Sequence, residues 1–260
     1  DSSAEWQDVS VAGGYSVPSD DLWSFTQWGN QILAVNIDDP TQTYTMGTSA
    51  LFANLAGSPP QARQIAVVRD FVVVGDTWDG VDGFQTQRVR WSAIGDPTSW
   101  TVSAATQSDF QDLSGPNGTV KKVIGGEFGT IFQERAITRM TYVGSPAIFQ
   151  FDTIEESRGT PASGSVVKLG RNIFYLGDDG FYVFDGVQST PISHNKISKT
   201  FLDDLDTDYY HRITAALDPI NQIIMWSYPG SGNSNGTPNR VVSFNYSQDA
   251  KYRWSYSEIE

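Results

Sequence analysis

The chain has 260 residues and a mass of 28.6 kDa, enough for one large all-β domain or two ordinary domains. It carries 17 Lys and Arg against 30 Asp and Glu, a net charge of −13, so it lacks the positive field on which binding to phosphate backbones depends. Cysteine is absent, and His194 and His211 are the two histidines, which excludes disulfides, thiolate chemistry and multi-histidine metal cages. Catalytic hypotheses are therefore restricted to carboxylate mechanisms.

The first ten residues, DSSAEWQDVS, are polar and acidic rather than basic and then apolar. No window approaches the roughly 20 apolar residues that span a bilayer. We therefore expect neither a secretion signal nor a membrane contact. Because the first residue is Asp rather than Met, we expect a mature or trimmed piece of a longer product.

A repeated pair of apolar strands joined by a tight turn predicts the fold. Aromatic residues make up 13% and charged residues 18%, and 24 Gly and 12 Pro separate short runs of Val, Ile, Phe, Tyr and Trp. The hairpin recurs at intervals of 43 to 55 residues, close to the ~40 to 50 residues of one propeller blade. Its five copies begin at Leu22, Ile65, Val120, Ser165 and Ile213.

We predict a single all-β domain over residues 1–260, a β-propeller of about five four-stranded blades. The blades are expected at about 22–57, 65–104, 120–155, 165–192 and 213–259. Residues 1–16, with a strand at 5–11, would close the ring or belong to an extra blade. Sandwiches and jelly rolls also have short, regularly spaced strands and are the alternative.

One short helix is predicted over residues 195–206, between the fourth and fifth blades. Ser193 or Asn195 can cap its start. We expect the helix to cover exposed blade edges, with docking of a partner as the alternative. Its apolar side chains, which share one helical face, are Ile197, Phe201, Leu202 and Leu205.

Carboxylates are the abundant chemical group, so an acid/base pair of the glycosidase type has to be considered. Such a pair needs two carboxyl groups about 5 to 9.5 Å apart. Most candidates lie in turns, where Asp is expected for backbone reasons, and we predict no catalytic residue and no enzyme. The candidates on or beside inner strands are Asp70, Asp76, Glu127, Glu134 and Asp218.

Two acidic runs resemble parts of calcium loops. Asp204, Asp206 and Asp208 match the start of an EF-hand loop, but Tyr209 stands where the loop needs Gly and Ala215 where it needs Glu. We predict no metal at either run, and no cofactor, because no phosphate-binding or dinucleotide motif occurs. The looser run consists of Asp76, Asp79 and Asp82.

The eight Trp allow a sugar-binding surface as one interpretation. Packing in the core or between blades is the simpler one for those within predicted strands. These are Trp91, Trp100, Trp226 and Trp254.

Five acidic doublets are the least expected charge pattern. In a four-stranded blade, the loops between the second and third strands and between successive blades open on one face. On the predicted strands all five doublets belong to this set, so we predict one acidic face, opposite a face with Arg69, Arg171 and Lys251. The doublets are Asp20 and Asp21, Asp38 and Asp39, Glu155 and Glu156, Asp178 and Asp179, and Asp203 and Asp204.

Several motifs resemble the packaged-DNA stabilisation proteins, or tail hub and nozzle proteins, of short-tailed bacteriophages. They are RVRWSAIGDPTSWTVS at 88–103, ERAITRMTYVGSPAIFQFDTI at 134–154, NIFYLGDDGFYVFDG at 172–186 and PISHNKIS at 191–198. The resemblance covers about residues 65–205 and is one of layout and short motifs. The first and last repeats carry little of it.

The resemblance implies a β-propeller virion protein of the phage tail or neck, made in the host cytoplasm. It would form a homo-oligomeric ring, a hexamer, next to the portal and adaptor, and would offer sites for tail fibres or spikes. DNA would pass the negative wall without sequence-specific binding. The alternative function is a carbohydrate-binding propeller or a glycosidase-like receptor-binding protein, in which exposed Trp and paired carboxylates meet in one pocket.

Overall fold

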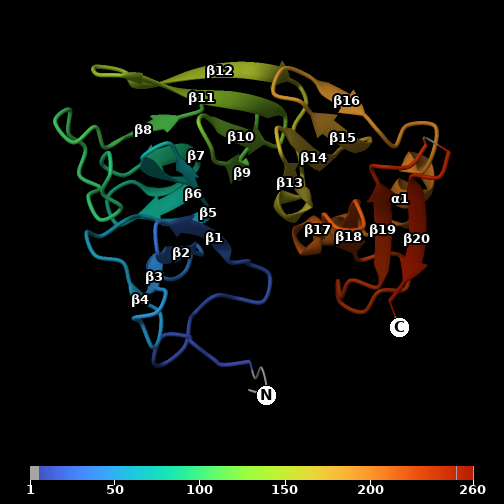
Figure 1. The fold of residues 1–260 in the computed structure, drawn as a ribbon, viewed down its shortest axis with the longest axis horizontal. Helices are drawn as coiled ribbons and strands as arrows, with labels where there is room; N and C mark the ends of the chain where they lie inside the picture. The colour runs from blue at the N-terminus through green and yellow to red at the C-terminus, as the bar shows by residue number, and fades with distance from the viewer. Residues whose placement is uncertain (1–5, 250, 260) are drawn as a thin grey trace. The chain divides into compact units, whose positions relative to one another are not determined.

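A computed structural model describes residues 6–249 and 251–259 of the protein. Within these residues the backbone forms five antiparallel sheets of four strands each, the architecture of a five-bladed β-propeller (Figure 1). In every sheet the strands lie side by side in the order in which they occur in the chain. The propeller predicted from the repeated hairpin is confirmed.

The inner strands of the sheets are runs of apolar and β-branched residues, and tight turns with Gly, Asn or Asp join many of them, as between β1 and β2 and between β14 and β15. The first sheet contains β1 (Ser24–Trp28), β2 (Gln31–Val35), β3 (Gln42–Thr45) and β4 (Ala53–Asn54), and the second β5 (Gln61–Val68), β6 (Phe71–Asp79), β7 (Gly83–Trp91) and β8 (Asp109–Asp112). The third contains β9 (Val120–Ile124), β10 (Gly129–Gln133), β11 (Ala136–Gly144) and β12 (Ile148–Glu156). The fourth contains β13 (Val167–Leu169), β14 (Asn172–Gly177), β15 (Gly180–Phe184) and β16 (Ser189–Pro191), and the fifth β17 (Thr214–Asp218), β18 (Ile223–Tyr228), β19 (Arg240–Asn245) and β20 (Trp254–Glu258).

The chain divides into two compact units. The first takes the described residues up to Ser114, together with 123–130 and 140–150. The second takes 115–122, 131–139 and the described residues from Phe151 onwards. The strands of the third sheet are thus divided between the two units.

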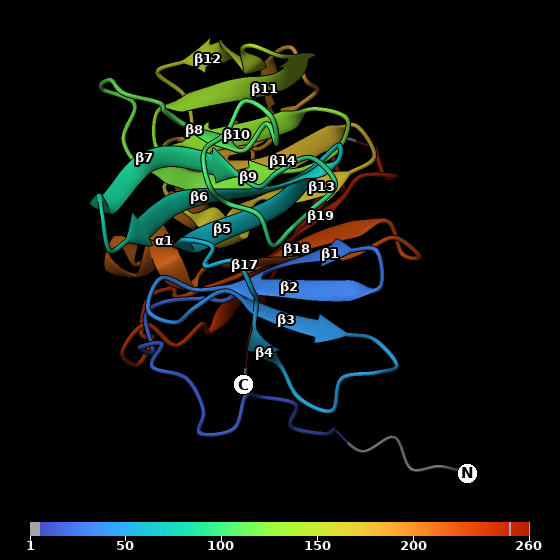
Figure 2. The same cartoon turned by 90° about the vertical axis from the view of Figure 1, so that its left-hand side faces the viewer.

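The first unit is held by apolar side chains of its first two sheets, which Figure 2 shows as two ladders of strands. Leu33 and Val35 of β2 share one buried cluster with side chains of β5 and β6, and Trp100 enters it from a loop. A second group of rings joins Trp91 of β7 to Phe149 of β12, with centroids 5.1 Å apart. Aromatic and β-branched side chains therefore supply the burial on which the sheets depend.

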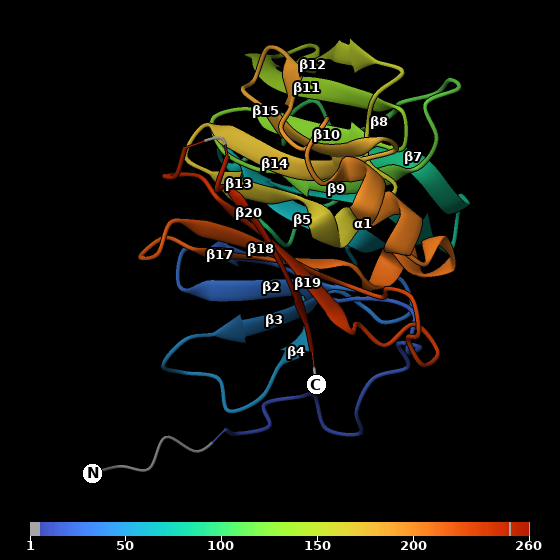
Figure 3. The same ribbon diagram turned by 90° about the vertical axis from the view of Figure 1, so that its right-hand side faces the viewer.

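The core of the second unit is also aromatic. Trp226 of β18 is fully buried and packs on Phe181 of β15, with ring centroids 4.5 Å apart. Helix α1 (Ser198–Asp204), visible in Figure 3, adds Phe201, whose ring centroid lies 4.6 Å from that of Tyr228. The helix therefore contributes to the core of this unit as well as covering strand edges.

Two expected strands do not form. Residues 6–11 are not a strand, although the Phe52 amide donates to the Val9 carbonyl at 2.8 Å; Glu5 lies outside the described residues. Residues 100–103 are a loop, and the fourth strand of the second sheet is β8 instead. Trp100 is buried, and its indole N–H donates to the Pro97 carbonyl at 2.8 Å. Its large apolar side chain therefore fills the core from a loop, although in the sequence it indicated a strand.

The predicted helix is shorter than expected. It spans 198–204 and is followed by a 3₁₀ segment, η2 (Thr207–Arg212). Neither Ser193 nor Asn195 caps it by a side chain, because the helix begins after Ile197, with no side-chain cap hydrogen bond. The Ser193 hydroxyl accepts from the Phe181 amide at 2.7 Å, and the Ser193 carbonyl accepts from Ile197 N at 3.1 Å.

Within the part of the chain that the structure describes, no helix is long and apolar enough to cross a membrane.

We predict that Phe201→Ala lowers the free energy of unfolding by about 3–5 kcal/mol, because it leaves a cavity in a well-packed aromatic cluster. Urea unfolding followed by circular dichroism measures the change. The exposed Lys199→Ala on the same helix is the control and should stay within about 0.5 kcal/mol of the unchanged protein. Equal effects of the two changes would show that α1 is not part of the core.

Candidate functional site

A polar cleft of about 390 Å³ lies in the second unit, where connecting segments meet. Two bases, Lys121 and Arg135, face it together with three carboxylates. Strand β9 supplies Lys121, turns supply Glu134, Arg135 and Asp178, and η2 supplies Asp208, Tyr210 and His211. The complete lining is Lys121, Glu134, Arg135, Pro161, Asp178, Asp208, Tyr210 and His211.

Glu134 is the anchored acid of this cleft. The Lys121 ammonium lies 3.2 Å from its carboxylate, and the Thr119 hydroxyl donates to the same oxygen at 3.1 Å. The backbone at Gly118 comes so close that a Cβ there would lie 2.1 Å from Glu134 Oε2, and its φ of +78° favours glycine. The turn therefore places the carboxylate in a fixed position.

Tyr210 gives the cleft a neutral hydroxyl. Burial raises the pKa of Tyr210, and the negative charge of Asp178 raises it further. The phenol thus keeps its proton across the neutral range and can donate a hydrogen bond.

Four of the five doublets lie in the connections expected to carry them, and the fifth forms the end of a fourth strand, β12. Within its sheet, each precedes the first strand, ends or follows the fourth, or sits between the second and third. Asp20 and Asp21 precede β1, and Asp38 and Asp39 join β2 to β3. Glu155 and Glu156 end β12, Asp178 and Asp179 join β14 to β15, and Asp203 and Asp204 end α1 between the fourth and fifth sheets.

In the first unit, one carboxylate of each doublet fixes a loop. Asp21 receives two hydrogen bonds from Arg63, at 2.9 and 3.3 Å, and the same guanidinium lies 3.3 Å from Asp76. Asp39, 9% exposed, accepts from the Ser16 amide at 3.0 Å. The partners Asp20 and Asp38 are exposed.

Asp38 lies near the negative charge of its neighbours. Desolvation raises the pKa of Asp38, and the charge of Asp21 adds to the increase, against the opposing effect of Arg63. This carboxylate therefore takes up a proton more readily than an isolated Asp.

The doublets of the second unit follow the same division. Glu155 accepts from the Ser189 amide, and Asp179 accepts from the Tyr182 hydroxyl at 2.7 Å. Asp204 accepts from the Tyr256 hydroxyl at 2.7 Å and from the Tyr228 hydroxyl at 2.9 Å. Their neighbours Glu156, Asp178 and Asp203 are exposed, and Asp178 reaches the cleft. Asp179 is also exposed, at 64% of its side chain, although its carboxylate is hydrogen-bonded.

A second polar group surrounds Tyr182. His194 Nε2 lies 3.3 Å from the Tyr182 oxygen, and the Arg158 guanidinium lies 4.5 Å from the ring centroid. Burial, followed by the hydrogen bond with Asp179, raises the pKa of Tyr182 to about 12. This arrangement fixes the turn between β14 and β15.

The other candidate carboxylates are engaged separately. Asp76 contacts Arg63, Glu127 lies 3.6 Å from Arg69, and Asp218 accepts from the Asn221 amide in its turn. Asp70 belongs to the turn after β5, which leaves Glu134 as the member of this set that lines the cleft.

The acidic runs considered for calcium have other contacts. Asp79 and Asp82 pair with Arg90 and Arg88, at 3.2 and 2.5 Å. Asp206 accepts from the Asp208 amide in the turn that begins η2. Among residues 6–249 and 251–259, no group of three or more His, Asp or Glu side chains could hold a metal ion.

Glu134, Asp178 and Asp208 are named from the sequence for three separate reasons, as an acid/base candidate, a doublet member and part of a calcium-like run, and no common cleft is predicted. The available signal is the polar and aromatic run DYYHR at 208–212, which begins four residues after the acidic helix end at Asp204. The buried positions of Trp91, Trp100 and Trp226 confirm their predicted role in packing. The cleft can hold a polar group between its basic and acidic side chains. One oxygen of Glu134 is already engaged by the Lys121 ammonium and the Thr119 hydroxyl.

The fold places the chain in the class of β-propellers. No family model matches it, and no curated protein matches it. The solved structure of YCF48 bound to D1 peptide is similar to it, with a TM-score of 0.51 over 91% of this chain and 67% of the other. At 9% identity, this similarity shows the fold alone.

We predict that Asp204→Asn lowers the free energy of unfolding at pH 7 by about 1–3 kcal/mol, because two tyrosine hydroxyls lose their charged acceptor. Burial opposes ionisation of Asp204, but hydrogen bonds from Tyr256 and Tyr228 outweigh it and lower its pKa below 3.8. The carboxylate therefore contributes stability at neutral pH, and this contribution is lost as the pH falls through the folded pKa.

Urea unfolding at pH 7 and pH 3 measures the effect, and the difference between the two proteins should shrink at the lower pH. Asp203→Asn, at the exposed neighbour, is the matched control and should change little at either pH. A pH-independent loss for Asp204→Asn would contradict the assigned role of its charge.

Proposed function

We propose that the protein is a structural component of a tailed-phage virion, a tail hub or nozzle protein that continues the DNA channel and guides the packaged genome. One observation carries the proposal. Each acidic doublet has an exposed carboxylate beside one that is tied into the fold. The motifs between residues 65 and 205 that resemble the phage proteins add to it.

The tied carboxylates hold the connecting loops in place, and the exposed ones give these loops negative charge. A wall of the same sign as DNA repels the phosphate backbone and gains no counterion release from contact with it. DNA would then slide past during ejection instead of adhering. The chemistry required of the protein is electrostatic, and we assign it no catalytic step.

The proposed assembly is a homo-oligomeric ring, a hexamer, that contacts a portal or adaptor protein and tail fibres or spikes. The proposed location is the virion. These features come from the family resemblance, and the net charge of −13 is compatible with them.

A carbohydrate-binding propeller is the second candidate function. The observation in its favour is a concave site on the first sheet where Tyr15, Trp23 and Phe25 gather. Asp8 is the carboxylate among the side chains that line this site, whereas a glycosidase needs a pair.

We predict that the protein forms rings in negative-stain images and does not retain double-stranded DNA in gel-shift assays near 0.15 M salt. A variant with lysine at Asp20, Asp38, Glu156, Asp178 and Asp203 should bind DNA, with an affinity that falls steeply as salt increases. The control has Asn or Gln at the same five positions and should bind much less.

A protein that remains monomeric at every concentration would count against the hub assignment. Salt-sensitive binding of DNA by the unchanged protein would contradict the proposed electrostatic mechanism.

A further inference from the structure

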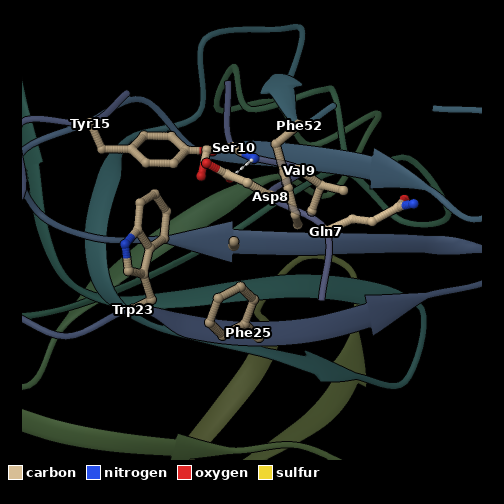
Figure 4. A pocket seen from close by; sticks show the side chains of 9 residues that line it. Gln7, Asp8, Val9, Ser10, Tyr15, Trp23, Phe25 and Phe52 are labelled. Carbon is tan, nitrogen blue, oxygen red and sulfur yellow. Dashed lines mark hydrogen bonds between the residues drawn. The ribbon is translucent and has the colours of Figure 1, made fainter. Parts of the chain in front are cut away.

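An aromatic cavity of about 320 Å³ lies on the first sheet, within the first unit (Figure 4). Figure 4 shows the rings of Tyr15, Trp23 and Phe25 around one hollow, with Asp8 above it. Phe52 adds a fourth ring to the lining. The cavity therefore combines aromatic walls with a single carboxylate.

The sheet itself creates this hollow. Ser24 of β1 is buried, and the alternation of the strand turns the next side chain, Phe25, to the opposite face, where it is 58% exposed. The residue paired with Phe25 on β2 is Ala34, whose small side chain leaves space beside the ring. Phe25 is exposed and Tyr15, Trp23 and Phe52 are half-buried. Accessible aromatic rings that gather in one concave patch indicate a ligand or partner, unlike apolar side chains scattered singly over a surface.

The walls are fixed before any ligand arrives. Tyr15 and Trp23 meet edge to face, with centroids 4.6 Å apart, and Trp23 lies 6.2 Å from Phe25. The Tyr15 hydroxyl accepts from the Val11 amide at 3.1 Å. The next residue, Ser16, is attached to the carboxylate of Asp39 at 3.0 Å, so the loop is tied at both sides of the ring.

The segment that forms this cavity carries acidic side chains and no basic ones. Residues 1–62 contain seven Asp and Glu and no Lys, Arg or His. Asp8 stands at the cavity, and its Oδ1 accepts from the Ser10 amide at 2.9 Å, which orients the carboxylate. Such a field attracts cations and repels anions.

We propose that the cavity binds an organic cation, an ammonium group carried on an apolar body. Aromatic faces attract a positively charged nitrogen within about 6 Å of the ring centroid, and a carboxylate at the rim adds to this attraction. The apolar walls accommodate the carbon atoms that surround or carry the nitrogen. Free quaternary ammonium compounds and lysine side chains share this chemistry, and titration with a probe of each kind separates them.

The primary test compares choline with 3,3-dimethylbutan-1-ol, its neutral analogue of nearly the same shape. Titration of the ¹⁵N-labelled protein is followed through the indole N–H signal of Trp23, which is assigned by its loss in Trp23→Leu. We expect saturable binding of choline that is at least roughly fivefold tighter than that of the alcohol.

Three variants show which contacts are responsible. Trp23→Leu should weaken choline binding by roughly 5- to 30-fold, monitored through the remaining signals of the cavity. Asp8→Asn keeps an oxygen for the Ser10 amide, and it should weaken choline roughly two- to fivefold while leaving the alcohol unchanged. Trp78→Leu removes a half-buried indole outside the cavity and should leave both affinities unchanged.

A parallel titration with N-acetyl-lysine methylamide identifies the source of the cation. Tighter binding of this probe than of choline assigns the site to lysine side chains of a partner, and the reverse assigns it to quaternary ammonium compounds. Equal binding of choline and the alcohol would overturn the proposal, as would the absence of a saturable shift with either cation. Binding of glucose but of neither cation would also overturn it and assign the cavity to carbohydrate.

Discussion

Phe181 of β15 packs on Trp226 of β18, which belongs to the next sheet. The second unit depends on such aromatic contacts between neighbouring four-stranded sheets. Phe71 and Phe149 make the corresponding contact in the first unit, with centroids 5.0 Å apart. The chain has no cysteine, so burial of aromatic and β-branched side chains has to supply the stabilising free energy that disulfides supply elsewhere. The buried faces of the sheets are therefore mostly apolar, and charged side chains buried within strands are paired, as Arg88 of β7 is with Asp82 and Asp112.

That constraint explains how the acidic doublets are arranged. A connection has few apolar contacts, so a hydrogen-bonded carboxylate is an effective way to fix it. Asp39 and Asp204 do this by accepting backbone and hydroxyl donors. Their neighbours Asp38 and Asp203 are left exposed and set the charge of the same loops. One short sequence feature thus combines a structural group with a surface charge.

Much of the fold follows from the sequence because period-two apolar runs and turn residues are local signals. The hairpins at Ile65 and Asn172 are clear examples. The failures also have local causes. Strand β8, DFQD, has one apolar side chain and is detectable only by its pairing with β7. Trp100 resembles a strand residue in the sequence, but it is buried in the core from a loop.

The polar cleft was harder to predict than the strands, since Glu134 and Tyr210 are 76 positions apart and nothing local indicates that they face one cavity. The aromatic cavity was equally hard to predict, because the space beside Phe25 depends on its pairing with the small Ala34 on β2.

The uneven distribution of basic residues also affects how the protein is detected. Trypsin cleaves after Lys and Arg, and the first such residue is Arg63, within β5. After tryptic digestion, all residues of the first sheet and of the aromatic cavity therefore remain in one long acidic peptide. Standard peptide mass spectrometry detects such a peptide poorly. A protease that cuts at acidic residues, which are frequent in this segment, would be needed to follow modification or crosslinking of this part of the molecule.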